Sequence, residues 1–170
     1  MESVVKTKLI DIQDKLLEKY PKLEQYKGSN VLLTGGTGFK GSWLKNFLLI
    51  LGAKVENIDI NSISSVGDFS TIYYGQSKTH CLDIACNETL EFLKTKSYDF
   101  IFHLAAQPLV IPSVDHPAFT WRTNVMGTIN ALEIARKREK PPVCIIVTSD
   151  KVYKNTGLIG DKLSEDSVLG

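Results

Sequence analysis

The stretch Val31-Leu-Leu-Thr-Gly35-Gly-Thr-Gly38-Phe-Lys-Gly41-Ser-Trp-Leu44 decides the fold of this chain. An apolar run leads into a Gly-x-x-Gly-x-x-Gly turn, which opens an apolar helical pattern. The first glycine permits a tight bend, the second lets backbone N–H groups approach a ligand, and the third lets the helix pack closely. A helix start also offers unpaired N–H groups and partial positive charge to a phosphate. The stretch predicts a strand, a phosphate-binding turn and a helix, although the glycines could also serve only as a tight turn.

Four more apolar runs follow this strand, and helical patterns separate most of them. The predicted strands span 31–34, 54–60, 80–82, 100–105 and 143–148, and the predicted helices span 39–51, 88–96 and 117–138. Strands that alternate with helices pair in parallel through right-handed crossovers. We therefore predict an α/β fold for residues 29–170, a doubly wound parallel sheet of about five strands. The polar stretch 61–78 reads as a loop.

Residues 1–28 are predicted to form a helical extension before this domain. An apolar stripe at helical spacing runs toward Pro21, where the helix should end; it consists of Val5, Leu9, Ile12, Leu16 and Tyr20. Acidic and basic residues nearly balance in this segment. The balance favours a helix docked on the domain over one that binds a membrane surface.

The composition argues against several classes of protein. The 170 residues include 20 Lys and Arg against 19 Asp and Glu, and a net charge of +1 does not suit a nucleic-acid binder. With 43% hydrophobic and 23% charged residues, the chain is typical of globular proteins. Three cysteines without clustered metal ligands predict a reduced, cytoplasmic protein with no metal site. No apolar stretch predicts a signal peptide or a membrane span.

Two acidic residues near strand ends extend the predicted phosphate site toward a dinucleotide. Asp59 ends the second predicted strand, at roughly the 20-residue spacing from the glycine turn expected of a ribose-binding acid. Its carboxylate would accept hydrogen bonds from the ribose hydroxyls and repel a 2′-phosphate, so NAD is favoured over NADP. Asp83 follows the third strand, where it could accept from the adenine amino group. Asp59 could also be an ordinary exposed acid at a strand end.

From residue 26 onward the chain resembles the N-terminal part of an extended short-chain dehydrogenase/reductase, and specifically the nucleotide-sugar 4,6-dehydratases of the CDP-glucose type. Four blocks carry the resemblance: the glycine turn through Leu44, His103-Leu-Ala-Ala-Gln-Pro-Leu-Val110, Thr123-Asn-Val-Met-Gly-Thr128 and Val147-Thr-Ser-Asp-Lys-Val-Tyr153. Dehydratases of the dTDP-glucose type have Thr-Asp-Glu where this chain has Ser-Asp-Lys. The resemblance implies an NAD-dependent lyase that converts a hexose nucleotide to its 4-keto-6-deoxy form, and a homodimer in the full-length family.

The resemblance also implies roles for individual residues. Ser149 is expected to hydrogen-bond the C4 oxygen of the sugar, Asp150 to protonate the leaving C6 hydroxyl, and Lys151 to remove the C5 proton. These three residues follow a central strand at its carboxyl end, where doubly wound sheets bind ligands. Without the resemblance they would read as a solvated turn. The predicted cofactor-binding residues are Gly35, Gly38, Phe39, Lys40, Gly41, Asp59, Asp83, Ile84, Ala105, Ala106, Gln107, Asn124 and Thr148.

The chain departs from the family pattern at several places. Gly36 replaces a histidine, Asn61 an aspartate, and Ile111-Pro112 an Arg-Arg pair that are common in the CDP-glucose type. The catalytic Tyr-x-x-x-Lys pair of the family is expected just beyond Gly170, so the chain looks truncated. Tyr74-Gly-Gln-Ser-Lys78 has that spacing but lies on the adenosine side of the predicted sheet. An epimerase or reductase of the same superfamily and an inactive NAD-binding remnant remain alternatives.

Two smaller expectations concern the apolar strands. His103, inside such a strand, is expected to be a buried and hydrogen-bonded core residue rather than a ligand or base. The apolar strand 143–147 suits cover on both faces but would be the edge of the sheet in this chain. We expect the chain alone to be poorly soluble or to associate with a partner.

Overall fold

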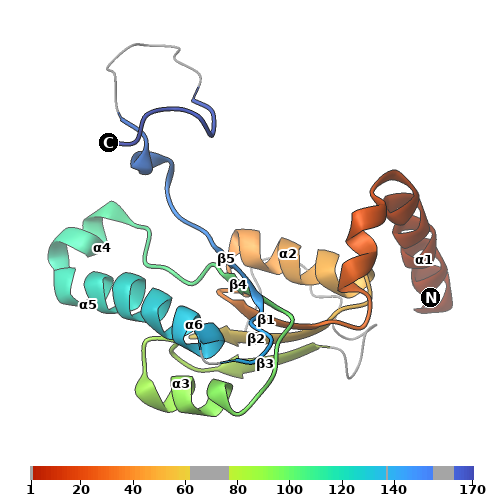
Figure 1. The fold of residues 1–170 in the computed structure, drawn as a ribbon, viewed down its shortest axis with the longest axis horizontal. Coiled ribbons are helices and arrows are strands. Elements are labelled where there is room, and N and C mark those ends of the chain that lie inside the picture. The colour runs from red at the N-terminus through yellow and green to blue at the C-terminus, as the bar shows by residue number, and fades with distance from the viewer. Residues whose placement is uncertain (1, 62–76, 137, 155–162) are drawn as a thin grey trace.

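A computed structural model describes residues 2–61, 77–136, 138–154 and 163–170 of the chain. Five parallel strands form one sheet in the order β3-β2-β1-β4-β5, as Figure 1 shows. The strands are β1 (Asn30–Thr34), β2 (Lys54–Asp59), β3 (Ser77–Cys81), β4 (Phe100–His103) and β5 (Val143–Ile146). The strand β1 lies at the centre of the sheet. From β1, successive strands are added first on one side (β2, β3) and then on the other (β4, β5). The predicted doubly wound parallel sheet is confirmed.

Helices cover both faces of the sheet (Figure 1). The helical segments of the domain are α2 (Phe39–Ile50), α3 (Asn87–Lys94), α4 (Val110–Asp115), α5 (Pro117–Trp121), a π-helical turn (Arg122–Met126) and α6 (Gly127–Arg136). On one face, Leu48 and Leu49 of α2 join Val31, Leu33 and Phe100 in a buried cluster. On the other face, Leu93 of α3 and Ile134 of α6 pack in a second cluster with strand residues that include Leu32, Ile58 and Ile101.

Several element boundaries differ from those predicted. The strands β2, β4 and β5 end at Asp59, His103 and Ile146, one or two residues before the predicted ends. The residues just beyond these ends leave the sheet and include Ile60, Leu104, Ala105 and Val147, which line a cavity described below. The strand β3 begins at Ser77, earlier than predicted. Its first residues were missed because they are polar, and a strand at the edge of the sheet requires no apolar pattern.

The helical region after β4 also differs from the prediction. The single helix expected over 117–138 is interrupted by the π-helical turn and is described only to Arg136. The short helix α4 was not predicted, because Pro112 lies inside it. That proline falls in the first helical turn, where its missing N–H removes no intrahelical hydrogen bond. Most of the expected 61–78 loop, with Tyr74, lies outside the described residues.

The N-terminal segment forms α1 (Glu2–Lys19), followed by a 3₁₀ helix over Pro21–Tyr26. As expected, the long helix ends close to the proline, at Lys19. In Figure 1, α1 lies at one end of the molecule beside α2, and the two helices are in contact. Leu9 from its apolar stripe is buried. No helix in the described ranges is both long and apolar enough to cross a membrane.

Candidate functional site

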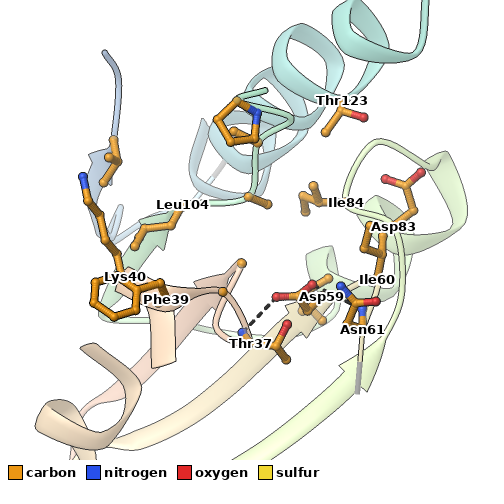
Figure 2. Close-up of a pocket in the computed structure, with 18 of the residues that line it drawn as sticks. Thr37, Phe39, Lys40, Asp59, Ile60, Asn61, Asp83, Ile84, Leu104 and Thr123 are labelled. Carbon is orange, nitrogen blue, oxygen red and sulfur yellow. Dashed lines mark hydrogen bonds between the residues drawn. The ribbon is translucent and has the colours of Figure 1, made fainter. Parts of the chain in front are cut away.

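A cavity of about 490 Å³ lies at the carboxyl ends of the strands. Figure 2 shows its surroundings: Phe39 and Lys40 stand on one side, Asp59 and Asn61 lie together on another, and Thr123 comes from the helical layer. Ten of the predicted cofactor-binding residues line it: Gly35, Gly38, Phe39, Lys40, Gly41, Asp59, Asp83, Ile84, Ala105 and Ala106. Residues predicted from four separate parts of the sequence are thus brought together around one cavity.

The glycine turn has the backbone geometry that its sequence predicts. Gly35 has φ +74°, in the left-handed region. A Cβ atom on this residue would lie 2.7 Å from the backbone nitrogen of Ala105. On Gly41, a Cβ atom would overlap the carbonyl oxygen of Gly35 and lie 2.8 Å from Cα of Gly36. The third glycine therefore lets α2 pack closely, as expected, and the surface it packs against is the turn itself.

The start of α2 offers unpaired N–H groups to a ligand. The N–H groups of Gly36 and Thr37 donate to Oδ1 of Asn57 (2.9 Å) and Oδ2 of Asp59 (2.9 Å). Gly38 is the N-cap residue of α2, and no side chain of the described residues caps the helix. The first N–H groups of an α-helix have no intrahelical partner. Those of residues 39–41 are therefore left for a ligand, and a phosphate group of a dinucleotide fits this requirement.

Asp59 lies where the second strand ends and joins β2 to the glycine turn. Besides the bond from Thr37, its Oδ1 accepts a hydrogen bond of 3.3 Å from the backbone N–H of Asn61. A carboxylate has about four acceptor positions, so Asp59 can still accept hydrogen bonds from ribose hydroxyls. Both Asp59 and Asn61 line the cavity.

Asp83, after β3, is held in an ion pair that the sequence did not predict. Its Oδ2 lies 2.8 Å from Nη2 of Arg122, and its Oδ1 accepts a hydrogen bond of 2.8 Å from the N–H of Ala85. Nη2 of Arg122 also lies 3.0 Å from Sγ of Cys86. The π-helical turn is thereby tied to the loop after β3, at the side of the cavity where adenine was expected.

The loop after β4 is held by a helical asparagine. Oδ1 of Asn124 accepts a hydrogen bond of 2.8 Å from the N–H of Gln107, and its Nδ2 donates to the carbonyl oxygen of the same residue at 3.1 Å. Neither residue lines the cavity. Asn124 therefore shapes the site indirectly, by fixing the loop that carries Ala105 and Ala106.

His103 at the end of β4 is buried and hydrogen-bonded, as expected. Its Nδ1 lies 2.7 Å from Oγ1 of Thr34, and its Nε2 lies 3.2 Å from Oγ1 of Thr128. The Thr128 hydroxyl donates to the carbonyl oxygen of Asn124, so it accepts from Nε2, and Nδ1 accepts from Thr34. This arrangement requires a neutral ring, and burial lowers the pKa of His103 to about 4.

The predicted catalytic residues follow β5 but do not border the cavity. Val147 lines it, whereas Thr148 and Ser149 are exposed beyond it. Asp150 begins a short 3₁₀ helix that ends at Val152. The backbone N–H of Lys151 donates to Oγ of Ser149 at 3.1 Å. Ser149, Asp150 and Lys151 therefore follow the cavity residue Val147 closely in the sequence, but none of them lines the cavity.

Half of the cavity wall was missed by sequence reasoning. The missed residues are Thr37, Ile58, Ile60, Asn61, Leu82, Leu104, Pro108, Phe119, Thr123 and Val147. Most are apolar or flank a predicted site residue, and their position one or two residues beyond a strand end is the signal that could have found them. Phe119 had no such signal, because only the path of the helical layer brings it to the cavity.

Comparison with known proteins relates this site to sugar-nucleotide enzymes. The family model described as GDP-mannose 4,6 dehydratase matches residues 32–165. A CDP-glucose 4,6-dehydratase of Salmonella typhimurium is 36% identical over 132 residues, 76% of this chain and 37% of that protein. A CDP-paratose 2-epimerase of Salmonella typhi is 30% identical over 133 residues, 72% of this chain and 37% of that protein.

A solved structure has the same architecture. The epimerase Mth375 of Methanothermobacter thermautotrophicus is 28% identical with a TM-score of 0.70, and the match covers 84% of this chain and 42% of that one. The chain thus spans 37% of the two curated relatives named above. The glycine turn and the parallel sheet agree with the family match. The chain therefore belongs to the GDP-mannose 4,6-dehydratase family of nucleotide-sugar dehydratases and epimerases.

Proposed function

We propose that this chain is the NAD-binding part of a nucleotide-sugar 4,6-dehydratase that acts on CDP-glucose. One observation carries the proposal: α2 begins at a glycine without a capping side chain, at a cavity that also contains Asp59 and Asp83. A helix start attracts phosphate, and the two carboxylates suit the hydroxyls of ribose and the amino group of adenine. The similarity to a CDP-glucose 4,6-dehydratase supports this choice of substrate.

The chain's own residues would hold the dinucleotide along the cavity. The N–H groups of residues 39–41 would bind the diphosphate, and Asp59 the adenosine ribose. A 2′-phosphate beside the Asp59 carboxylate would be repelled, which favours NAD over NADP. Ala105 and Ala106 leave room beside the backbone for the rest of the cofactor. NAD, when bound, supplies reversible uptake of hydride from the sugar.

The residues after β5 would perform the proton transfers of the dehydration. Ser149 would hydrogen-bond the C4 oxygen, Asp150 would give a proton to the leaving C6 hydroxyl, and Lys151 would remove the C5 proton. Asp150 must then be protonated and Lys151 neutral before water leaves. A neutral Lys151 serves both requirements, because a neighbouring cation would favour the charged form of the aspartate. These roles are the ones implied by the resemblance of the Ser-Asp-Lys sequence to the nucleotide-sugar dehydratases.

Calorimetry with the 170-residue chain tests the cofactor assignment. We expect saturable binding of NAD and at least about 10-fold weaker binding of NADP, because the carboxylate repels the extra phosphate. The Asp59→Asn variant keeps an acceptor for the N–H of Thr37 but removes the charge. It should therefore reduce the difference in affinity between NAD and NADP. Absence of heat with either dinucleotide from folded protein would refute the proposal.

The substrate requires a second experiment, because the chain spans about two fifths of its relatives and is expected to show no turnover alone. The 132 residues of this chain that align with the Salmonella typhimurium enzyme can replace the matching part of that enzyme. Formation of a 4-keto-6-deoxy product from CDP-glucose by this chimera supports the dehydratase. NAD binding without product would favour the inactive remnant.

An epimerase is the second candidate, because the chain is also similar to a CDP-paratose 2-epimerase and to the epimerase Mth375. The pair Asp150 and Lys151 argues against it, since an epimerase has no water to eliminate. An epimerised sugar nucleotide without loss of water from the same chimera would favour this alternative.

A further inference from the structure

Asn57 is an unusual residue for the middle of a central strand. Its side chain is fully buried in β2, on the face that also carries the buried Val55. The Nδ2 group has no hydrogen-bond partner among the described residues. A buried, unpaired amide costs free energy. An apolar side chain would avoid this cost, but it could not accept a hydrogen bond.

Oδ1 of Asn57 accepts the hydrogen bond from Gly36 in the glycine turn, at 2.9 Å. The two residues also fill the same space. A Cβ atom on Gly36 would overlap Oδ1 of Asn57 and lie 2.6 Å from its Cγ. No side chain can therefore stand at position 36 while Asn57 keeps this conformation.

Asn57 acts together with Asp59, two residues further along the same strand. Alternate residues of a strand point to the same face, and these two accept from the successive N–H groups of Gly36 and Thr37. The turn is thus held at two adjacent points from β2. With these donors occupied, the N–H groups at the start of α2 are the ones that remain for a ligand.

We propose that Asn57 is a positioning residue with two effects. It sets the geometry of the glycine turn that would bind the diphosphate, and it restricts position 36 to glycine. The proposal rests on the dinucleotide site proposed above. Asn57 does not line the cavity, so it acts on the ligand only through the turn. A binding loop held in its bound geometry loses less conformational freedom on binding, and tighter binding results.

The first test compares ligands with and without the diphosphate. In Asn57→Leu, a side chain of similar size no longer accepts from Gly36. We expect binding of NADH and ADP-ribose to weaken about 10-fold, and binding of adenosine, followed by NMR titration, to change less than 2-fold. Leu93→Ala, in the buried core under α3, is the control that destabilises the fold away from the turn.

A double-mutant cycle tests the steric coupling and serves if Asn57→Leu does not fold. Gly36→Ala should lower both the melting temperature and the affinity for ADP-ribose. Adding Asn57→Gly to it frees the space, so the double variant should melt higher and bind more tightly than Gly36→Ala alone. Additive effects would overturn the proposal.

The outcomes separate the two proposals. If the unaltered chain binds no dinucleotide, the proposed function and the role of Asn57 both fail. If it binds NADH but Asn57→Leu binds equally well, only the role of Asn57 fails. Equal weakening of adenosine and ADP-ribose would show a general loss of structure and would likewise overturn it.

Discussion

At the scale of single residues, glycines in the same backbone conformation have different reasons to be glycine. Gly28 and Gly35 have nearly equal φ angles of +73° and +74°. A Cβ atom on Gly28 would meet nothing within 4 Å, whereas one on Gly35 would meet the backbone of Leu104 and Ala105. A side chain at position 28 would therefore cause only conformational strain. A side chain at position 35 would cause the same strain and would also overlap with backbone atoms.

This pair yields a matched prediction. Gly28→Ala should lower the free energy of unfolding by about 1 kcal/mol, the cost of a left-handed alanine. Gly35→Ala should lower it by about 3 kcal/mol, because overlap with the loop after β4 adds to that cost. Urea denaturation of both variants measures the difference. Equal losses would show that the loop moves away freely.

His103 makes stability depend on pH. Burial lowers its pKa to about 4, below the ordinary value of 6.5. Between these values the unfolded chain binds a proton that the folded chain does not. The neutral His103 therefore contributes about 3 kcal/mol to the free energy of unfolding above pH 6.5. This contribution is lost as the pH falls toward 4.

Denaturation curves between pH 4 and 7 would reveal this contribution. The unaltered chain should lose stability over that range, and His103→Gln should show a flatter dependence because no imidazole remains to titrate. His116→Gln, at an exposed histidine, is the control and should keep the slope of the unaltered chain. A slope unchanged by His103→Gln would contradict the assignment.

At the scale of elements, a partly buried carboxylate joins β2, β3 and the segment after α3. Glu56 accepts from Nε2 of His80 (2.7 Å) and the hydroxyl of Tyr98 (2.6 Å), and it pairs with Lys96. Burial alone would raise the pKa of Glu56, but the hydrogen bonds from Lys96, Tyr98 and His80 outweigh it and hold the pKa below its ordinary value. Burial, together with the hydrogen bond to Glu56, raises the pKa of Tyr98.

Removing this charge should loosen the β2–β3 side of the sheet. Glu56→Gln should cost about 2 kcal/mol at pH 7, because hydrogen bonds to a charged group are lost. The difference in the free energy of unfolding between this variant and the unaltered chain should become smaller in acid. It shrinks at pH values below 4.5, the ordinary pKa of a glutamate, because Glu56 itself becomes protonated there.

Glu91→Gln is the matched control, since its ion pair with Lys94 is exposed. Such pairs contribute little, so its cost should stay below about 0.5 kcal/mol. Thermal denaturation over a pH series measures both variants. A Glu56→Gln cost as small as that of Glu91→Gln would show that the three contacts contribute no net stability.

At the scale of the whole molecule, the sheet has an apolar edge. In the described residues β5 pairs only with β4, so the sheet ends there as the sequence predicted. Val143, Ile145 and Val147 are 56%, 36% and 45% exposed. An exposed, apolar edge strand is a template for pairing with another chain.

We therefore expect the chain to self-associate. Sedimentation velocity should show oligomers or aggregate for the unaltered chain and a larger monomer fraction for Val143→Lys/Ile145→Lys, because charge on an edge strand opposes pairing. Val168→Lys, at an exposed apolar residue outside the sheet, adds charge elsewhere and should not help. A monodisperse monomer of the unaltered chain would contradict the expectation.

The sequence by itself determined the order of strands and helices along the chain, the glycine turn and half of the residues that line the cavity. These features depend on local patterns: apolar runs, glycine spacing and acids at strand ends, which short-range sterics and burial dictate. It also indicated the buried state of His103, because a histidine inside an apolar run has few other options.

The tertiary structure alone decided which distant groups meet. The bond from Gly36 to Asn57, the pairing of Arg122 with Asp83, and the place of Phe119 at the cavity all join residues from different elements. No local pattern encodes such contacts, because they depend on strand order, on the path of the helical layer and on how closely β2 approaches the turn. The residues that hold the site in shape therefore became visible only in the folded chain.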